Sequence, residues 1–170
     1  MPRPNSVTLR FLAEPSQVNF GGKVHGGAVM KWLDQAGYAC AAGWTGQYCV
    51  TAWVGAIRFL RPIAVGELVE VGARLIHTGR TSMQIAVDVY AGPPTSAEHH
   101  RAGHCVMTFV AVDPAGRPAP VPPWQPETPV DLALDEYARR LMEMRASLDR
   151  EIEERLRWLD QQRPAVTGRG

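Results

Sequence analysis

The sequence predicts an α+β fold in which an antiparallel sheet wraps around one buried central helix. The helix is indicated by an almost uninterrupted apolar run over residues 28–44, in which Lys31 and Asp34 are the only charged residues. A helix with so little polar surface must be covered on nearly all sides. The sheet is indicated by the chain that follows, where strand-like segments alternate with turn residues at hairpin-like spacing and could supply that cover.

Five segments are expected to form the strands of this sheet. Residues 82–90 carry the clearest pattern, because apolar residues alternate there with mostly polar neighbours. Clusters of glycine, proline and aspartate separate the segments from one another. The predicted strands cover residues 6–12, 49–60, 68–77, 82–90 and 104–112. The central helix begins at Gly26 and Gly27 and ends near Gly43 and Gly46.

The C-terminal part of the chain is predicted to be a long amphipathic helix. Residues 117–129 contain six prolines and form an extended linker, and Thr128-Pro129-Val130-Asp131 is typical of a capped helix start. Apolar residues then recur at spacings of three and four between Leu134 and Leu159. This narrow stripe suits docking on the sheet or on a partner subunit, and residues after Arg163 look like a frayed tail. We therefore divide the chain into a domain over residues 1–127 and a helical extension over residues 128–170.

Composition excludes several classes of function. The net charge is +1 with no basic stripe, so no nucleic-acid partner is expected. No segment reaches the roughly 18 apolar residues of a membrane helix, and no signal peptide is evident. The three cysteines, Cys40, Cys49 and Cys105, form no C-x-x-C pair and lie in apolar segments, which indicates buried thiols. A cytoplasmic protein that binds neither membrane nor nucleic acid is expected.

Asp34 is the first functional candidate. A carboxylate enclosed between helix and sheet is costly unless it is paired or used in chemistry. The alternative is an ion pair with Lys31, one turn earlier, on a solvent-facing strip of the helix.

Several motifs, in order and at matching separations, resemble the acyl-CoA thioesterases of the hotdog fold, in particular the broad-specificity acyl-CoA hydrolase group. Residues 19–34 match an asparagine, the V-H-G-G motif and an acid seven residues past the second glycine. The other matching segments are Phe59-Leu60-Arg61-Pro62 followed by Gly66, Gly79-Arg80-Thr81-Ser82-Met83, and the exit segment 121–128. The resemblance implies a hotdog fold, hydrolysis of acyl-CoA to a free acid and CoA, and homodimers assembled into a trimer of dimers. It implies no metal and no cofactor apart from the CoA of the substrate.

The resemblance also assigns roles to residues. Asp34 matches the general base or nucleophile, Asn19 the polar group that positions water or substrate, and Gly27 the backbone donor to the oxyanion. The start of a helix offers free N–H groups and a partial positive charge, which suits that last role. The remaining candidates for binding substrate or CoA are His25, Gly26, Arg58, Gly79, Arg80, Thr81 and Ser82.

The spacing of these residues predicts that the site is shared between subunits. Asp34 lies seven residues beyond Gly27, about 10 Å along one helix. Both groups must reach one thioester carbon directly or through one water. Two antiparallel helices facing each other across a two-fold axis would place Asp34 of one chain near Gly27 and Asn19 of the other.

Other interpretations remain open from the sequence. A hotdog enoyl-CoA hydratase or acyl-carrier-protein dehydratase would use a histidine such as His25, and a non-catalytic acyl-CoA sensor would share the fold. Asn19 could serve only its own turn. His99, His100 and His104 suggest a metal, but no cysteine accompanies them at ligand spacing. Acyl chain length would depend on pocket depth, for which Trp32, Trp53 and Met83 are the candidates.

Overall fold

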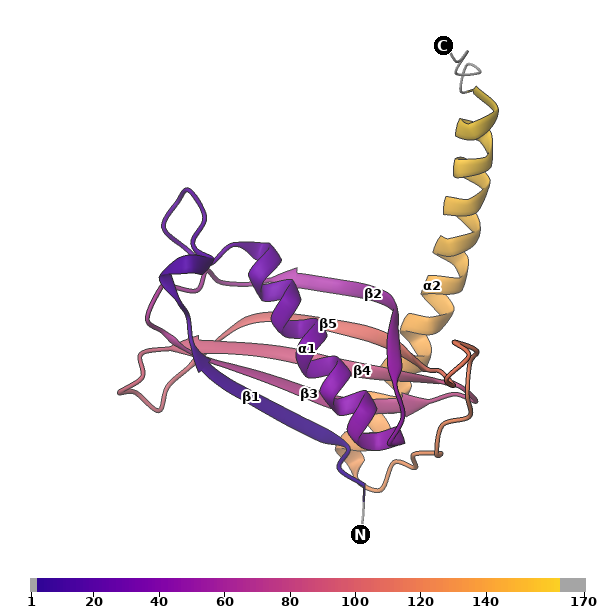
Figure 1. Ribbon diagram of the computed structural model, residues 1–170, viewed down its shortest axis with the longest axis horizontal. Coiled ribbons are helices and arrows are strands. Elements are labelled where there is room, and N and C mark those ends of the chain that lie inside the picture. The colour runs from indigo at the N-terminus through magenta and orange to yellow at the C-terminus, as the bar shows by residue number, and fades with distance from the viewer. Residues whose placement is uncertain (1–2, 163–170) are drawn as a thin grey trace.

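The computed structural model describes residues 3–162 and confirms the predicted order of elements (Figure 1). A short 3-10 helix, Pro15–Gln17, lies in the loop between the first strand and the first helix. The last strand begins at His100 rather than at the predicted His104, and the tail predicted after Arg163 lies outside the described residues. The main elements are β1 (Ser6–Leu12), α1 (Gly26–Thr45), β2 (Cys49–Phe59), β3 (Leu68–Thr78), β4 (Ser82–Gly92), β5 (His100–Ala111) and α2 (Pro129–Gln162).

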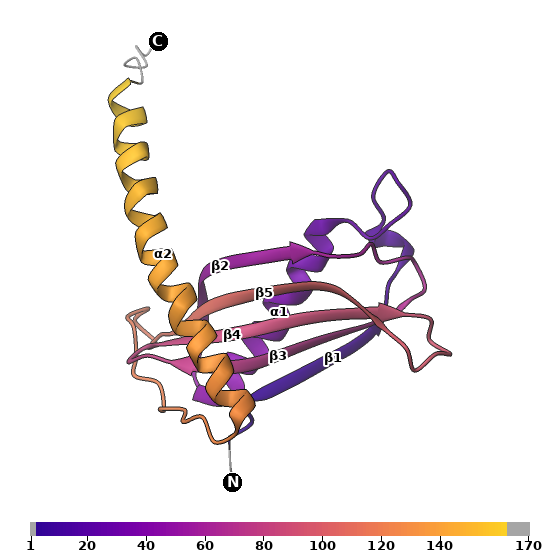
Figure 2. The ribbon, with the colours of Figure 1, turned by 180° about the vertical axis from the view of Figure 1, so that it is seen from behind.

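The strands form one antiparallel five-stranded sheet in the order β1-β3-β4-β5-β2. The strands β1 and β2 are therefore its two edges. Helix α1 lies across one face of the sheet, and α2 begins on the opposite face and then extends past the β2 side of the sheet (Figures 1 and 2). The molecule thus has three layers, with the sheet between two helices.

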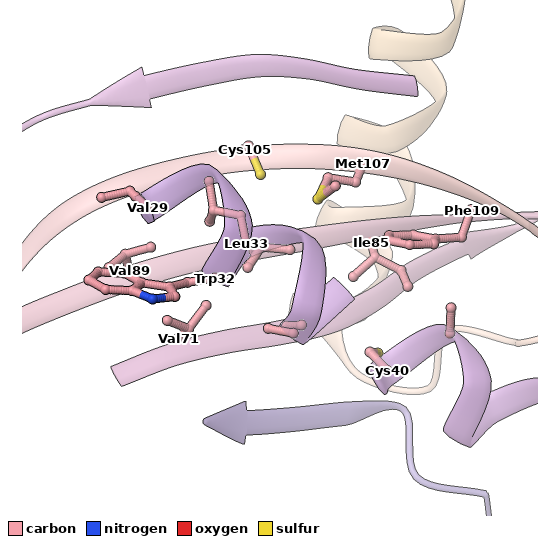
Figure 3. Close-up of a cluster of buried hydrophobic side chains, with 14 of the residues drawn as sticks. Val29, Trp32, Leu33, Cys40, Val71, Ile85, Val89, Cys105, Met107 and Phe109 are labelled. Atoms are coloured by element: carbon pink, nitrogen blue, oxygen red, sulfur yellow. The ribbon is translucent and has the colours of Figure 1, made fainter. Parts of the chain in front are cut away.

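The main core lies between α1 and the sheet. The side chains labelled in Figure 3 come from one face of α1 and from alternate positions of β3, β4 and β5. Gly37 permits the close approach of the helix, because a Cβ atom there would lie 2.7 Å from the ring of Phe109. Each large side chain buried here contributes roughly 1.5–3 kcal/mol to folding. This packing fixes the position of α1 over the sheet.

The opposite face of α1 is not covered within the single chain, which corrects the expectation of cover on nearly all sides. Met30 and Tyr38 are 46% and 39% exposed, and Asp34 is also exposed. The physical reason is that one sheet can cover only one face of a helix, and the opposite face of α1 carries Lys31, Asp34 and Gln35 together with Met30 and Tyr38. The sheet covers only the face that bears Trp32, Leu33 and their neighbours.

Helix α2 starts as predicted and docks on the other face of the sheet. The Thr128 hydroxyl accepts a hydrogen bond from the Asp131 N–H at 3.1 Å, and the Asp131 carboxylate accepts one from the Thr128 N–H at 3.0 Å. This reciprocal pair is a capping arrangement. A small second core follows, formed by Leu134, Tyr137, Ala138 and Leu141 over Ile76, Ala86 and Val106. The division into two domains at residue 127 stays a prediction.

The three cysteines are free and buried, as predicted. Burial raises the pKa of the Cys40 and Cys105 thiols to about 12. These thiols therefore stay protonated at neutral pH and act as small apolar core residues. Neither of the described α-helices is apolar enough along its length to cross a membrane.

Candidate active site

The start of α1 leaves backbone donors free. His25 is the N-cap residue, and its Nδ1 accepts a hydrogen bond from the Ala28 N–H at 3.0 Å. Because the helix begins at Gly26, the N–H groups of Gly26 and Gly27 have no acceptor within it, and neither has another partner among residues 3–162. His25 thus orders the turn, while two exposed N–H groups and the positive end of the helix dipole stand beside it.

The loop before α1 is organised by Asn19. Its Oδ1 accepts hydrogen bonds from the Gly21 N–H at 2.8 Å and the Lys23 N–H at 3.2 Å. Gly22 takes a positive φ of 74° in the same loop, which favours glycine. Asn19 therefore orders its own loop within the single chain, which is the alternative role that the sequence left open.

Asp34 is paired with a threonine that the sequence did not single out. The Thr51 hydroxyl of β2 donates a hydrogen bond to Asp34 Oδ1 at 2.6 Å. Within residues 3–162, Asp34 forms no ion pair with Lys31, so that alternative is not seen. A threonine in an edge strand is common, and only the fold reveals that this one reaches the helix.

An apolar pocket of about 280 Å³ opens beside this pair, between α1 and β2. Asp34 and Lys31 are its charged residues, and the remaining lining side chains are Met30, Leu33, Val54, Ile57 and Met107. A pocket with apolar walls and a carboxylate is suited to a molecule with an apolar chain and a polar reacting group.

The residues expected to set pocket depth lie elsewhere. Trp32 is buried against Phe11, with ring centroids 4.8 Å apart. Trp53 lies on the opposite face of the sheet, beneath Arg145 of α2, and Met83 is fully buried in the core. The bulge between Thr51 and Trp53 turns Trp53 away from α1, a feature that strand alternation alone cannot predict.

The single chain does not gather all the predicted site residues in one place. A Cβ atom on Gly26 would lie 3.5 Å from Phe59, so the start of α1 lies at the end of β2, near Arg58. The Gly79–Ser82 turn lies at the other end, since Ser82 pairs with Val110, which pairs with Val50 near the start of β2. Nine residues of extended strand separate the two ends by about 30 Å.

The Gly79–Ser82 turn is itself well ordered by backbone hydrogen bonds. The Gly79 N–H donates to Ser82 at 2.8 Å, and the carbonyls of Arg80 and Thr81 accept from the linker and from β5. The side chains of Arg58 and Arg80 are exposed. Both guanidinium groups are therefore accessible to a phosphate.

Two of the three histidines near the start of β5 contact polar side chains. His104 Nδ1 lies 3.0 Å from Asp88 and Nε2 lies 3.2 Å from the Tyr137 hydroxyl, while His99 lies 3.6 Å from Glu70. In the part of the chain that the structure describes, no group of three or more potential ligands is placed to hold a metal ion.

Comparisons with known proteins identify the family. The family model described as the thioesterase superfamily matches residues 21–98. The chain is 31% identical over 139 residues to the protein VdlD of Helicobacter pylori, covering 82% of this chain and 79% of VdlD. It is 35% identical over 119 residues to the acyl-CoA thioester hydrolase YciA of Salmonella typhimurium, covering 68% of this chain and 90% of YciA.

Solved structures extend the match to α2. An acyl-CoA hydrolase from Staphylococcus aureus in complex with coenzyme A superposes with a TM-score of 0.86 at 25% identity, covering 92% of this chain and 94% of that one. A hexameric thioesterase from Yersinia pestis superposes with a TM-score of 0.64 at 38% identity, covering 70% of this chain and 98% of that one.

The S. aureus structures include alanine variants of an asparagine, an aspartate and a threonine at positions 28, 43 and 60, which are separated by 15 and 17 residues. Asn19, Asp34 and Thr51 are separated by the same 15 and 17 residues. The threonine missed in the sequence thus stands where that hydrolase has a threonine chosen for substitution. With the family model, the curated relatives and the shared fold in agreement, this chain belongs to the thioesterase superfamily.

Proposed function

We propose that this enzyme is an acyl-CoA thioesterase that hydrolyses acyl-CoA to a free carboxylic acid and CoA. The observation that carries the proposal is the hydrogen bond of 2.6 Å from the Thr51 hydroxyl to Asp34 Oδ1, which lies beside an apolar pocket. The match of its spacing to the residues altered in the S. aureus acyl-CoA hydrolase supports it. The acyl chain would occupy the pocket, with its thioester carbon beside Asp34.

The proposed chemistry needs one base and one oxyanion donor. Asp34 takes a proton from water as the water oxygen attacks the thioester carbon. Alternatively, the Asp34 carboxylate attacks that carbon itself and forms a mixed anhydride, which a water then hydrolyses to the free acid and the regenerated carboxylate. The carbonyl oxygen gains negative charge and accepts a hydrogen bond from the Gly27 N–H. The C–S bond then breaks. The CoA thiolate leaves and takes up a proton. Thr51 holds the carboxylate in one orientation, and Asn19 positions water or substrate.

These groups must come from two subunits. Asp34 and Gly27 are seven residues apart on one straight helix, about 10 Å, which is too far for both to act on one carbon. Strand β2 is an edge, and pairing it antiparallel with the same strand of a second copy would reverse the direction of the partner's α1. The partner's Gly27 and Asn19 would then approach Asp34 from the opposite end.

The same reversal gathers the proposed CoA contacts. The Gly79–Ser82 turn of one subunit would come to the end where the other subunit has His25, Gly26 and Arg58. Arg80 and Arg58 would then bind CoA phosphates from two sides. A homodimer is thus the functional unit we propose, and the hexameric neighbour supports a trimer of dimers.

Two alternatives keep the same fold. A hydratase or dehydratase would need His25 as a base, but its Nδ1 already caps α1. A sensor would bind acyl-CoA without turnover, and the Asp34–Thr51 pair argues against it.

One assay separates the three functions. Acyl-CoAs from acetyl to palmitoyl are supplied with a thiol reagent, and enoyl-CoA is supplied with detection of its double bond. A thioesterase releases thiol from saturated acyl-CoAs, whereas a hydratase consumes only the double bond and a sensor does neither. Absence of thiol release across the whole panel would contradict the proposal.

A further inference from the structure

Helix α2 crosses the outer face of the sheet from one strand to the next until it reaches an edge. Near its start, Asp131 and Asp135 contact Arg74 and His77 of β3 at 2.6 and 2.7 Å. Further along, Tyr137 contacts His104 of β5 at 3.2 Å. The strand order β3-β4-β5-β2 makes β2 the last strand beneath the helix.

Arg145 of α2 contacts the last two strands beneath the helix. Its guanidinium lies 4.9 Å from the ring centroid of Trp53 on β2, and it donates a hydrogen bond to Thr108 of β5 at 3.3 Å. Beyond this point the helix continues to Gln162 with no strand of its own chain beneath it (Figure 2). We call residues 146–162 the arm.

The arm carries the same apolar stripe that docks the first half of α2. At 3.6 residues per turn, Leu148, Ile152, Leu156 and Leu159 lie within roughly 40° of one line, which also passes through Leu134, Ala138 and Leu141. The docked members are buried or half-buried. The members on the arm are 52%, 45%, 54% and 47% exposed. The stripe thus continues past the edge of the sheet in the direction of the sheet plane.

An exposed arm of this kind calls for cover. Most helical stability in proteins comes from packing an apolar face against another element, and the stripe on the arm is about half exposed. The edge beneath it is equally incomplete, because Val50 and Val54 of β2 are 37% and 39% exposed and the strand has a neighbour on one side only.

We infer that the arm docks on a second copy of this chain, on the outer face of a sheet that continues this one across β2. If two sheets join through their β2 strands, the partner's sheet occupies the plane that the arm overhangs. By two-fold symmetry the partner's arm covers this chain in return. The stripe then packs along its whole length, first on its own sheet and then on the partner's outer face and α2.

This inference rests on the edge-to-edge dimer proposed above, and its test uses a matched pair of variants. Ile152→Asp places a carboxylate at the centre of the stripe. Ser147→Asp places one on the same arm but about 140° around the helix, away from the stripe. Self-association is measured by dilution in an analytical ultracentrifuge, with circular dichroism to confirm that both variants keep their helix content. We expect the first variant to dissociate at a concentration at least tenfold higher and the second to match the wild type.

A third variant separates the arm from the edge. Val50→Lys places a charge on the β2 edge without touching the arm. Weaker association for Val50→Lys but not for Ile152→Asp would contradict the arm inference and leave the edge-paired dimer standing. Wild-type association in both variants would contradict the edge-paired dimer and the arm together.

A direct contact test uses a photoreactive phenylalanine analogue at Leu156. The labelled chain is mixed with ¹⁵N chain, and the isotope pattern of each cross-linked peptide identifies the copy from which it came. We expect cross-links to peptides of β2, β5 or α2 from the other copy. Cross-links confined to the same chain, or none above those of the analogue placed at Ser147, would overturn the inference.

Discussion

The two helices lie on opposite faces of one sheet and leave different surfaces uncovered. The free face of α1 carries a carboxylate held by a hydroxyl of the neighbouring strand, beside an apolar pocket. The free half of α2 carries a regular row of leucine and isoleucine between charged flanks. The free face of α1 thus combines a reactive group with a space for substrate, whereas the arm offers only apolar cover. The first arrangement indicates chemistry and the second indicates assembly.

The means of attachment differ as well. Helix α1 is held by close packing of small and apolar side chains, with Gly37 against Phe109. Helix α2 is held by a small apolar cluster together with polar pairs at its margin, such as Arg74–Asp131 and His77–Asp135. Changes on α1 should therefore affect turnover most, and changes on α2 should affect stability and association.

The largest effect is expected for Asp34→Asn. The substitution removes the base or nucleophile with little change in shape, so kcat should fall at least ~10²-fold while the fold is kept. Turnover is followed by thiol release, with Gln35→Ala as a control on the same exposed face. Near-normal turnover in the folded Asp34→Asn protein would show that Asp34 is not the base or nucleophile. The assignment of the chemistry to α1 would then fail.

A smaller loss is expected for Thr51→Val, which keeps the shape of the side chain and deletes its hydroxyl. A hydrogen bond to a charged group contributes roughly 1.5 kcal/mol or more, so kcat/KM should fall about 10-fold. The double variant with Asp34→Asn should be little worse than Asp34→Asn alone, because the hydroxyl acts through the carboxylate. Additive losses in the double variant would show that Thr51 has a separate role.

On the α2 side, Ala138→Leu should lower stability without changing the chemistry. Ala138 is fully buried between helix and sheet, and added methylene groups there cost about 1–3 kcal/mol. Urea unfolding measures the loss, and kcat per folded enzyme should stay close to the wild-type value. A fall in kcat with unchanged stability would instead connect α2 to the active site.

The smallest effect is expected on the stability of the fold at acidic pH. Hydrogen bonds from Thr128, with others from Glu127 and Arg74, hold the pKa of Asp131 below its ordinary value. Such a carboxylate stabilises the fold above its ordinary pKa of about 3.9, and this contribution is lost as the pH falls toward the lower folded value. Between about pH 6 and pH 3, wild-type stability should therefore fall more than that of Asp131→Asn. Parallel pH profiles of the urea midpoint would count against this role.

The order of elements could be predicted because each segment has a clear period. Helix α1 was indicated by its apolar run and β4 by its alternation, and the Thr128–Asp131 cap marked the start of α2. The start of β5 was less clear, since His100 and Arg101 resemble loop residues and join the strand only through pairing with Ala91 and Tyr90 of β4.

The site could be predicted in part. The sequence indicated Asn19, Gly27 and Asp34, and the structure places them in the loop, the first turn and the exposed face of α1. Nothing in the sequence indicated Thr51, because its hydrogen bond to Asp34 depends on how α1 lies beside β2. The exposure of one face of α1 could not be predicted either. Apolar content indicates that a helix needs cover, but it does not indicate whether the same chain or a partner provides it.

The central claim is that Asp34 of one subunit acts with Asn19 and Gly27 of the other, and mixed dimers test it most directly. Asn19→Ala and Asp34→Ala are prepared separately, and each homodimer should be nearly inactive. After the two chains are refolded together, half of the dimers are mixed, and one of the two sites in each mixed dimer carries no lesion. About a quarter of wild-type activity should therefore return, given two-fold symmetry. If no activity returns although mass spectrometry confirms mixed dimers, each site is built within one chain and the shared site is contradicted.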